Sequence, residues 1–211
     1  VLTSLPYLLR FASNRGRANR FYERFLCRPF VPPAGGIPSS GDEQVSLDLQ
    51  ERDGCKYCHA LLEPAAAHWG RWTEVGGAWL DPETFPPLRQ DCLICATTSA
   101  PCPAECREHY VVEALGAEEE PFLGQLRAYE FLDVAHQAGI EEGPALLARQ
   151  ALVDGRLPAC TARNAAAWLL GGTDADPRWY ASLGDEFVAS DLSWRELVRS
   201  IVTSDVYGRV R

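Results

Sequence analysis

Methionine is missing from this sequence of 211 residues. A thioether side chain is therefore not available as a ligand for any metal that the protein binds. Because the chain begins at Val1 and not at an initiator methionine, we expect it to be a processed or excised piece, with any export signal upstream of it.

A basic surface and a long apolar run are also missing. The 20 Lys and Arg residues are outnumbered by 29 Asp and Glu residues, which gives a net charge of −9. No basic stripe interleaved with aromatic residues is present, so we exclude nucleic acid as a partner. No apolar run approaches the roughly 18 residues that cross a bilayer, so we expect no membrane span in this chain. With 46% hydrophobic residues, the chain is long enough to bury a core.

The residues that are present predict a mostly α fold with little β structure. Apolar positions recur at helical spacing, and cap residues mark helix ends, such as Thr161 before residue 162 and the capping box that begins at Ser193. Prolines and glycines between residues 29 and 41 predict a stiff, extended connector. The expected helices cover residues 5–26 with a split at Gly16, 46–63, 123–138, 145–153, 162–170 and a last segment after Ser193.

The run Cys55-Lys56-Tyr57-Cys58-His59 is the strongest chemical signal in the chain. Two thiols separated by two residues on a helical turn can each add to one vinyl group of a haem, and the adjacent histidine then faces the iron. The motif predicts one covalent haem c, with His59 as the proximal ligand. A redox dithiol or half of a zinc site is the alternative, but a redox dithiol is typical of a βαβ context, which this sequence does not predict.

Six further cysteines remain, an even number that can pair completely into three disulfides. Haem attachment takes place outside the cytoplasm in most bacteria, and an oxidising compartment also lets thiols form disulfides. We therefore expect disulfides and a periplasmic or extracellular location. The spacing of the four cysteines between residues 92 and 106 also suits zinc or an iron–sulfur cluster. If these four pair among themselves, Cys27 and Cys160 are left to each other. The disulfide candidates are Cys27, Cys92, Cys95, Cys102, Cys106 and Cys160.

Three histidines can supply a second axial ligand. We prefer His136, because a returning helix can bring it over the haem, and we keep His68 and His109 as alternatives. An iron left open is the fourth possibility. Two histidine ligands favour a low reduction potential, because the methionine that raises it is absent, whereas an open iron suits peroxide or a gas.

Aromatic and basic residues near the motif are candidates for holding the porphyrin. Trp69 and Trp72 can pack on its flat face, although ordinary core packing explains them equally well. Arg17, Arg20 or Arg71 can pair with the haem propionates, although we expect most of these arginines to be solvated surface residues.

The haem motif and its surroundings resemble the planctomycete-type cytochrome modules, which occur in large secreted proteins of planctomycetes and myxobacteria. The C-terminal segment, Trp194 to Tyr207, is similar to a short domain found with these modules. The likeness rests on Arg17 to Phe30, the proline connector, the run from Cys55 to Pro64, and Gly70-Arg71-Trp72.

This resemblance implies an exported haem protein with Cys55 and Cys58 as attachment points and His59 as a ligand. The family has no settled biochemical role. The chain has Glu63-Pro64-Ala65-Ala66 where the commoner pattern has Asp-Pro-Leu-Gly, and it inserts the cysteine cluster. The second axial ligand is therefore not carried over from the family.

Taken together, the sequence predicts an exported monohaem cytochrome that transfers electrons without binding a substrate at the iron. Its expected partners are other redox proteins or identical subunits. The alternatives are a structural or interaction subunit of a cell surface or filament, stapled by haem and disulfides, and a peroxidase-like oxidoreductase. An electron carrier is favoured over an enzyme. We expect a haem-binding region in residues 1–110, with the cysteine cluster, and a helical region in residues 111–211.

Overall fold

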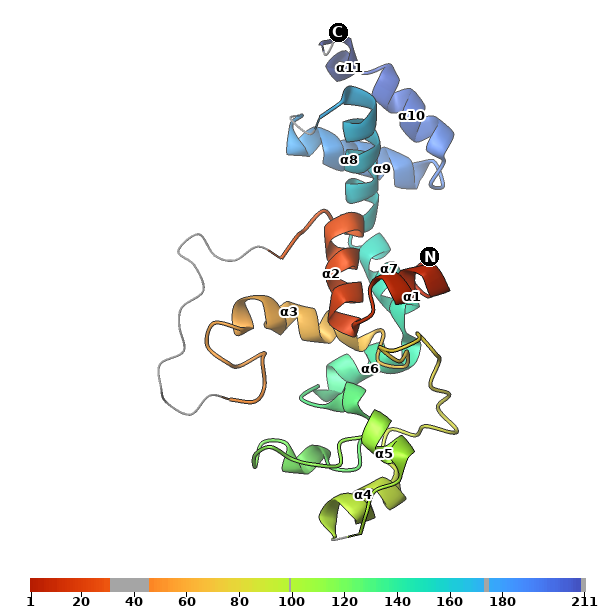
Figure 1. Cartoon of the computed structure of the whole chain (residues 1–211). Helices are drawn as coiled ribbons and strands as arrows, with labels where there is room; N and C mark the ends of the chain where they lie inside the picture. Colours follow the sequence, from red (N-terminus) through yellow and green to blue (C-terminus); the bar gives the residue numbers. More distant parts are fainter. Residues whose placement is uncertain (31–45, 99, 173–174, 210–211) are drawn as a thin grey trace. The chain divides into compact units, whose positions relative to one another are not determined.

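A computed structural model describes residues 1–30, 46–98, 100–172 and 175–209 (Figure 1). Most of the predicted connector, between residues 29 and 41, lies outside these residues. The described part of the chain contains eleven α-helices and no sheet, only three isolated β-bridges. The prediction of a mostly α fold with little β structure is confirmed. Within the described part, no helix has the length and apolar character that crossing a membrane requires.

The chain divides into two compact units. Unit 1 comprises Val1–Asn19 and Phe30–Leu147, and unit 2 comprises Arg20–Pro29 and Ala148–Arg211. The boundary that we expected near residue 110 does not coincide with this division. The motif from Cys55 to His59 and the cysteine cluster both belong to unit 1.

Unit 1 is built from short helices joined by long turns. Residues of α4 and α6 share a core with Tyr110 and Leu126, and α3 packs against α6. Helix α2 begins in unit 1 and ends in unit 2, and α7 does the same. The elements are α1 (Leu5–Arg10), α2 (Asn14–Phe25), α3 (Lys56–Ala67), α4 (Gln90–Thr97), α5 (Ala104–His109), the 3-10 turns η1 (Glu120–Phe122) and η2 (Arg127–Tyr129), α6 (Val134–Glu142) and α7 (Pro144–Val153).

Unit 2 contains α8 (Arg156–Leu170), α9 (Pro177–Ala189), α10 (Trp194–Val202) and α11 (Asp205–Arg209). Helix α8 packs along α9, and α10 packs on both. Their shared core includes Tyr180, Leu183, Leu197 and Ile201. The disulfide between Cys27 and Cys160 ties the end of α2 to α8, with an S–S distance of 2.10 Å.

Several helix boundaries differ from the expectation, and local side chains explain them. The first helix is interrupted at residues 11–13 and not at Gly16, because Ser13 Oγ accepts a hydrogen bond from Gly16 N (3.0 Å) at the start of α2. Residues 46–54 form turns instead of a helix, because Gly54 has φ +83° and the Asp48 carboxylate accepts from Gln50 N (2.8 Å). Helix α3 then continues past Pro64 to Ala67.

The predicted helix over residues 123–138 is mostly absent. Gly124 and Phe131 both have positive φ, which interrupts helical geometry. Helix α6 starts only after Asp133, whose carboxylate accepts from His136 N (2.8 Å) and so caps it. In unit 2, Thr161 lies inside α8 instead of capping it. Ser193 caps α10, because its Oγ accepts from Glu196 N (3.4 Å), but Ser193 N donates to the Ser190 carbonyl, so the reciprocal bond of the predicted capping box is absent.

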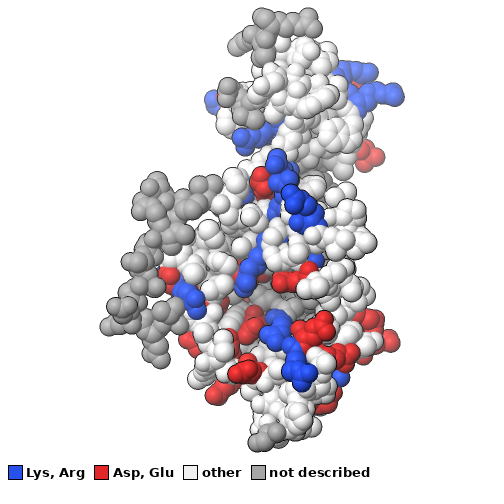
Figure 2. Space-filling view, in the orientation of Figure 1, with Lys and Arg blue, Asp and Glu red and all other residues white. Residues whose placement is uncertain are grey.

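The two units differ in charge. Unit 1 holds 20 of the 29 acidic residues but only 9 of the 20 basic ones, so its net charge is −11, against +2 for unit 2. On the face drawn in Figure 2, acidic side chains gather on unit 1, and basic ones outnumber them on unit 2. The acidity of the whole chain is therefore a property of unit 1, which carries the motif from Cys55 to His59.

Arg17 and Arg71, two of the three arginines considered for the propionates, are fully buried in unit 1, although we expected most of the three to be solvated. Arg17 donates to the carbonyls of Phe11 (2.9 Å) and Thr73 (3.0 Å), which joins α1, α2 and the segment after α3. Arg71 donates through one guanidinium nitrogen to the Phe85 carbonyl and pairs with Glu141 (2.6 Å) through another. Both side chains are therefore fixed by the protein itself.

Disulfide loop length predicts a graded effect on stability. Replacing Cys27 and Cys160 together by alanine should lower the free energy of unfolding by about 4 to 5 kcal/mol, because the bond spans 133 residues and restricts the unfolded chain most. Replacing Cys92 and Cys106, which are 14 residues apart, should lower it by about 3 kcal/mol. Urea unfolding without reductant measures both values. Equal losses for the two pairs would contradict this ranking.

Candidate functional site

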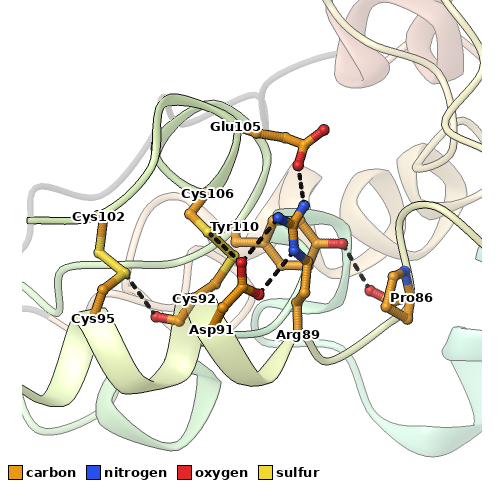
Figure 3. Close-up of polar contacts among 9 residues, drawn as sticks. All are labelled: Pro86, Arg89, Asp91, Cys92, Cys95, Cys102, Glu105, Cys106 and Tyr110. Atoms are coloured by element: carbon orange, nitrogen blue, oxygen red, sulfur yellow. Dashed lines mark hydrogen bonds and ion pairs between the residues drawn. A yellow bond between two sulfur atoms is a disulfide. The ribbon is translucent and has the colours of Figure 1, made fainter.

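All six predicted disulfide cysteines are paired, which confirms that prediction. The cluster forms two disulfides, Cys92–Cys106 (2.06 Å) and Cys95–Cys102, which join α4 to α5 and to the turn before it (Figure 3). Asp91 lies near Cys92 and Cys106, but these two sulfur atoms are bonded to each other. The cluster is therefore not a zinc or iron–sulfur site, which was the alternative interpretation.

Arg89 holds the surroundings of the cluster together. Its guanidinium pairs with Asp91 (2.9 Å) and Glu105 and lies over the Tyr110 ring, 5.6 Å from the ring centre (Figure 3). The Arg89 guanidinium lowers the pKa of Asp91, because it stabilises the ionised carboxylate. Arg89 thus joins α4, α5 and Tyr110 next to the two disulfides, and the cluster stabilises this part of unit 1.

Cys55 and Cys58 are the only two cysteines of the chain outside a disulfide. They lie at the start of α3, where Cys58 N and His59 N both donate to the Cys55 carbonyl, at 3.1 and 3.0 Å. Both thiols are partly exposed. The motif is thus placed on one helical turn, as haem attachment requires.

His59 is held by a chain of polar contacts. Its Nδ1 hydrogen-bonds Glu63, one turn further along α3, and Arg15 Nε of α2 donates to the same Glu63 oxygen (2.7 Å). An ionised carboxylate only accepts hydrogen bonds, so Nδ1 carries a proton, and in the neutral imidazole Nε2 then has the free electron pair. No described residue hydrogen-bonds Nε2. This is the arrangement of a histidine that is ready to ligate a metal through Nε2.

A cavity of about 600 Å³ lies in unit 1, within the usual range of ligand sites. Helix α3 contributes Glu63, Ala66 and Ala67 to its wall, so the lining begins one turn from His59. Residues 47–52 and 126–132 supply other parts of the wall. The arginines that line the cavity are Arg15, Arg52 and Arg127, none of which the sequence analysis singled out.

Of the three histidines considered for a second axial position, His109 is the one that lines the cavity. Its side chain is 14% exposed, its ring packs edge-on against Phe85, and its Nε2 lies 3.9 Å from a Glu108 oxygen. His136, the preferred candidate from sequence, is an exposed residue of α6 with Nδ1 3.0 Å from Asp133, and it does not line the cavity.

His68 is buried but packed against protein. Its Nδ1 bonds the Gly143 carbonyl (2.9 Å), and a Cβ built on Gly139 would lie only 3.2 Å from its Nε2. Helix α6 therefore covers the ring nitrogen that would have to reach a metal. Burial also lowers the pKa of His68, because the charged imidazolium is poorly solvated there.

The two tryptophans proposed to pack on a porphyrin are placed differently. Trp72 lines the cavity and forms an edge-on pair with Trp79, with ring centres 4.4 Å apart. Trp69 is fully buried, donates to the Leu2 carbonyl (3.0 Å) and stacks on Tyr7. Trp72 remains available to a ligand in the cavity, whereas Trp69 is part of the core beside α1.

Two carboxylates of the cavity wall were not anticipated. Glu119 is buried and accepts from Leu115 N (2.6 Å), and Glu130 lies near it. Burial raises the pKa of Glu130, and the Glu119 charge raises it further, while Arg127 and Arg15 act in the opposite direction. The cavity is therefore lined by both acidic and basic groups.

No protein-family model, curated protein or solved structure matches this chain. The likeness to planctomycete-type cytochrome modules therefore stays a prediction that rests on the quoted residues.

The pKa of Glu130 gives a prediction for pH dependence. Folded Glu130 binds its proton more tightly than the unfolded chain does, so its contribution to stability falls as pH rises from 4.5, the ordinary pKa of a glutamate, through the raised pKa. Glu130→Gln should therefore increase the free energy of unfolding at pH 7 and change it little at pH 3.5. Urea unfolding at both pH values measures this, with the exposed Glu120→Gln as the control. Equal effects of the two variants at pH 7 would contradict the assignment.

Proposed function

We propose that this protein is an exported monohaem c-type cytochrome that transfers electrons. The observation that carries the proposal is which cysteines remain unpaired. Six cysteines form disulfides, and the two that remain belong to the Cys55–His59 motif. His59 Nε2 has no hydrogen-bond partner among the described residues. The wall of the cavity begins with Glu63, one turn further along α3, and Cys55, Cys58 and His59 are not themselves lining residues. Two unpaired thiols and an adjacent imidazole on one helical turn fit a haem, which would supply a reversible Fe(III)/Fe(II) couple.

The side chains around the cavity have separable tasks in this proposal. Cys55 and Cys58 would hold the haem by thioether bonds, and His59 would ligate the iron. Trp72 and the alanines of α3 would cover apolar porphyrin surface. Arg15, Arg52 and Arg127 are the basic residues of the wall that can reach propionates, although Arg15 is already paired with Glu63.

Location and partners belong to the same proposal. Three disulfides suit an oxidising compartment, so we propose a periplasmic or extracellular protein. A net charge of −11 on unit 1 favours a redox partner with a basic surface, because complementary charge speeds association.

The decisive test is whether haem is attached. The protein, exported from a host with a c-type maturation system, should exceed the polypeptide mass by one haem and give a pyridine haemochrome spectrum of a c-type haem. Replacing Cys55 and Cys58 by alanine should abolish the added mass, whereas replacing Cys95 and Cys102 should leave it. A wild-type mass equal to that of the bare chain would overturn the proposal.

We propose that His109 would be the second protein ligand of the iron, because it borders the cavity and His68 and His136 do not. His109→Ala should convert low-spin iron to a form that binds carbon monoxide, since a coordination position is opened. His136→Ala is the matched control and should leave the low-spin spectrum unchanged. Loss of the low-spin spectrum in the His136 variant alone would reverse this choice, and high-spin wild-type iron that reacts with peroxide would favour the peroxidase alternative.

A further inference from the structure

We propose that Glu63, held by Arg15, sets the reduction potential of the iron by controlling how strongly His59 donates electrons to it. This inference rests on the proposed haem function and adds a positioning pair to it. Neither residue is a ligand, since both would act through the imidazole of His59.

Glu63 contacts His59 directly, and Arg15 contacts Glu63. Glu63 lies four residues after His59, so both side chains share a face of α3, and its carboxylate accepts from His59 Nδ1. Arg15 reaches the same oxygen from α2, 48 residues away in the sequence (2.7 Å). The Glu63 side chain is only 17% exposed and that of His59 23%, so water screens the contact between them less than it would screen a surface pair. The Arg15 side chain is 53% exposed, so water screens its contact with Glu63 more strongly.

The direction of the effect follows from charge. A carboxylate that accepts a hydrogen bond from Nδ1–H makes the imidazole a stronger electron donor, which stabilises Fe(III) over Fe(II). Its negative charge near the iron acts in the same direction. Arg15 draws electron density from the carboxylate and so weakens both effects. Glu63 should therefore lower the potential, and Arg15 should limit the decrease.

The two variants should change the reduction potential in opposite directions, which distinguishes this proposal from a purely structural role of the two residues. Glu63→Gln keeps an accepting carbonyl and the side-chain shape but removes the charge, so the potential should rise. Arg15→Gln leaves Glu63 with His59 as its partner, so the potential should fall. Loosening of the site would instead shift both variants in the same direction.

The experiment is potentiometric titration of the haem-loaded full chain. Outer-shell partners of metal-bound histidines change affinity by 10- to 100-fold, so Glu63→Gln should shift the Fe(III)/Fe(II) preference by a similar factor, or about 59 to 118 mV upward. Arg15→Gln should shift it downward. The proton on His59 Nδ1, followed by paramagnetic NMR, should exchange faster with solvent in Glu63→Ala than in the wild type.

Asp53→Asn is the control for charge alone. Asp53 is an exposed carboxylate two residues before Cys55, paired with Lys56 (2.6 Å) and without contact to His59. Its removal should shift the potential much less than Glu63→Gln does. Equal shifts in the two variants, or an unchanged potential in Glu63→Gln, would overturn the inference while the haem proposal stands.

The outcomes of the two proposals are separable. A wild-type chain without haem in the pyridine haemochrome assay removes both. If Glu63→Gln does not fold, Arg15→Gln is compared with Lys56→Gln, which removes an exposed positive charge that does not contact Glu63 or His59. A larger decrease of the potential in Arg15→Gln than in Lys56→Gln supports the inference, and an equal or smaller decrease overturns it.

Discussion

Which sulfur atoms bond to each other determines what this protein can do. Once Cys27, Cys160 and the four cysteines of the cluster are paired, reactive thiol chemistry is confined to the first turn of α3. The helix then fixes the spacing of these two thiols and places His59 beside them. Disulfides form in an oxidising compartment, and the proposed haem attachment would take place in the same kind of compartment, so the six paired cysteines and the two unpaired ones suit one environment.

The rest of unit 1 supports this turn by contacts that are distant in the sequence. Arg15 anchors Glu63, and the buried Arg17 and Arg71 join α1, α2 and the segments that follow α3 through main-chain carbonyls and Glu141. A buried guanidinium with several carbonyl partners holds short helices together where there is no sheet to do so. The cavity wall depends on these links, since it is assembled from segments that have few regular hydrogen bonds of their own.

Features governed by neighbouring residues could be predicted from the sequence. The mostly α class, the cap at Ser193 and the pairing of the six cysteines follow from local rules or from counting. Other features depended on backbone conformation that the apolar pattern does not reveal. The helix expected over residues 123–138 is lost because Gly124 and Phe131 adopt positive φ, and the pattern of apolar residues carries no sign of that.

Only those contacts of the candidate site that join residues close together in the sequence could be predicted. The spacing of His59 and Glu63 could have indicated their contact, because residues four apart on a helix are neighbours. Nothing local indicates that Arg15 joins them, or that His109 and not His136 borders the cavity. Those placements arise from how separate segments pack, as does the burial of two arginines that the sequence alone makes look like surface residues.

The disulfide between Cys27 and Cys160 turns almost the whole of unit 1 into a closed covalent loop that departs from unit 2 and returns to it. A protease that cuts the backbone once anywhere between these two cysteines leaves both pieces joined through sulfur. Unit 1 would thus survive a single cut as part of one molecule, and only reduction or a second cut could set it free.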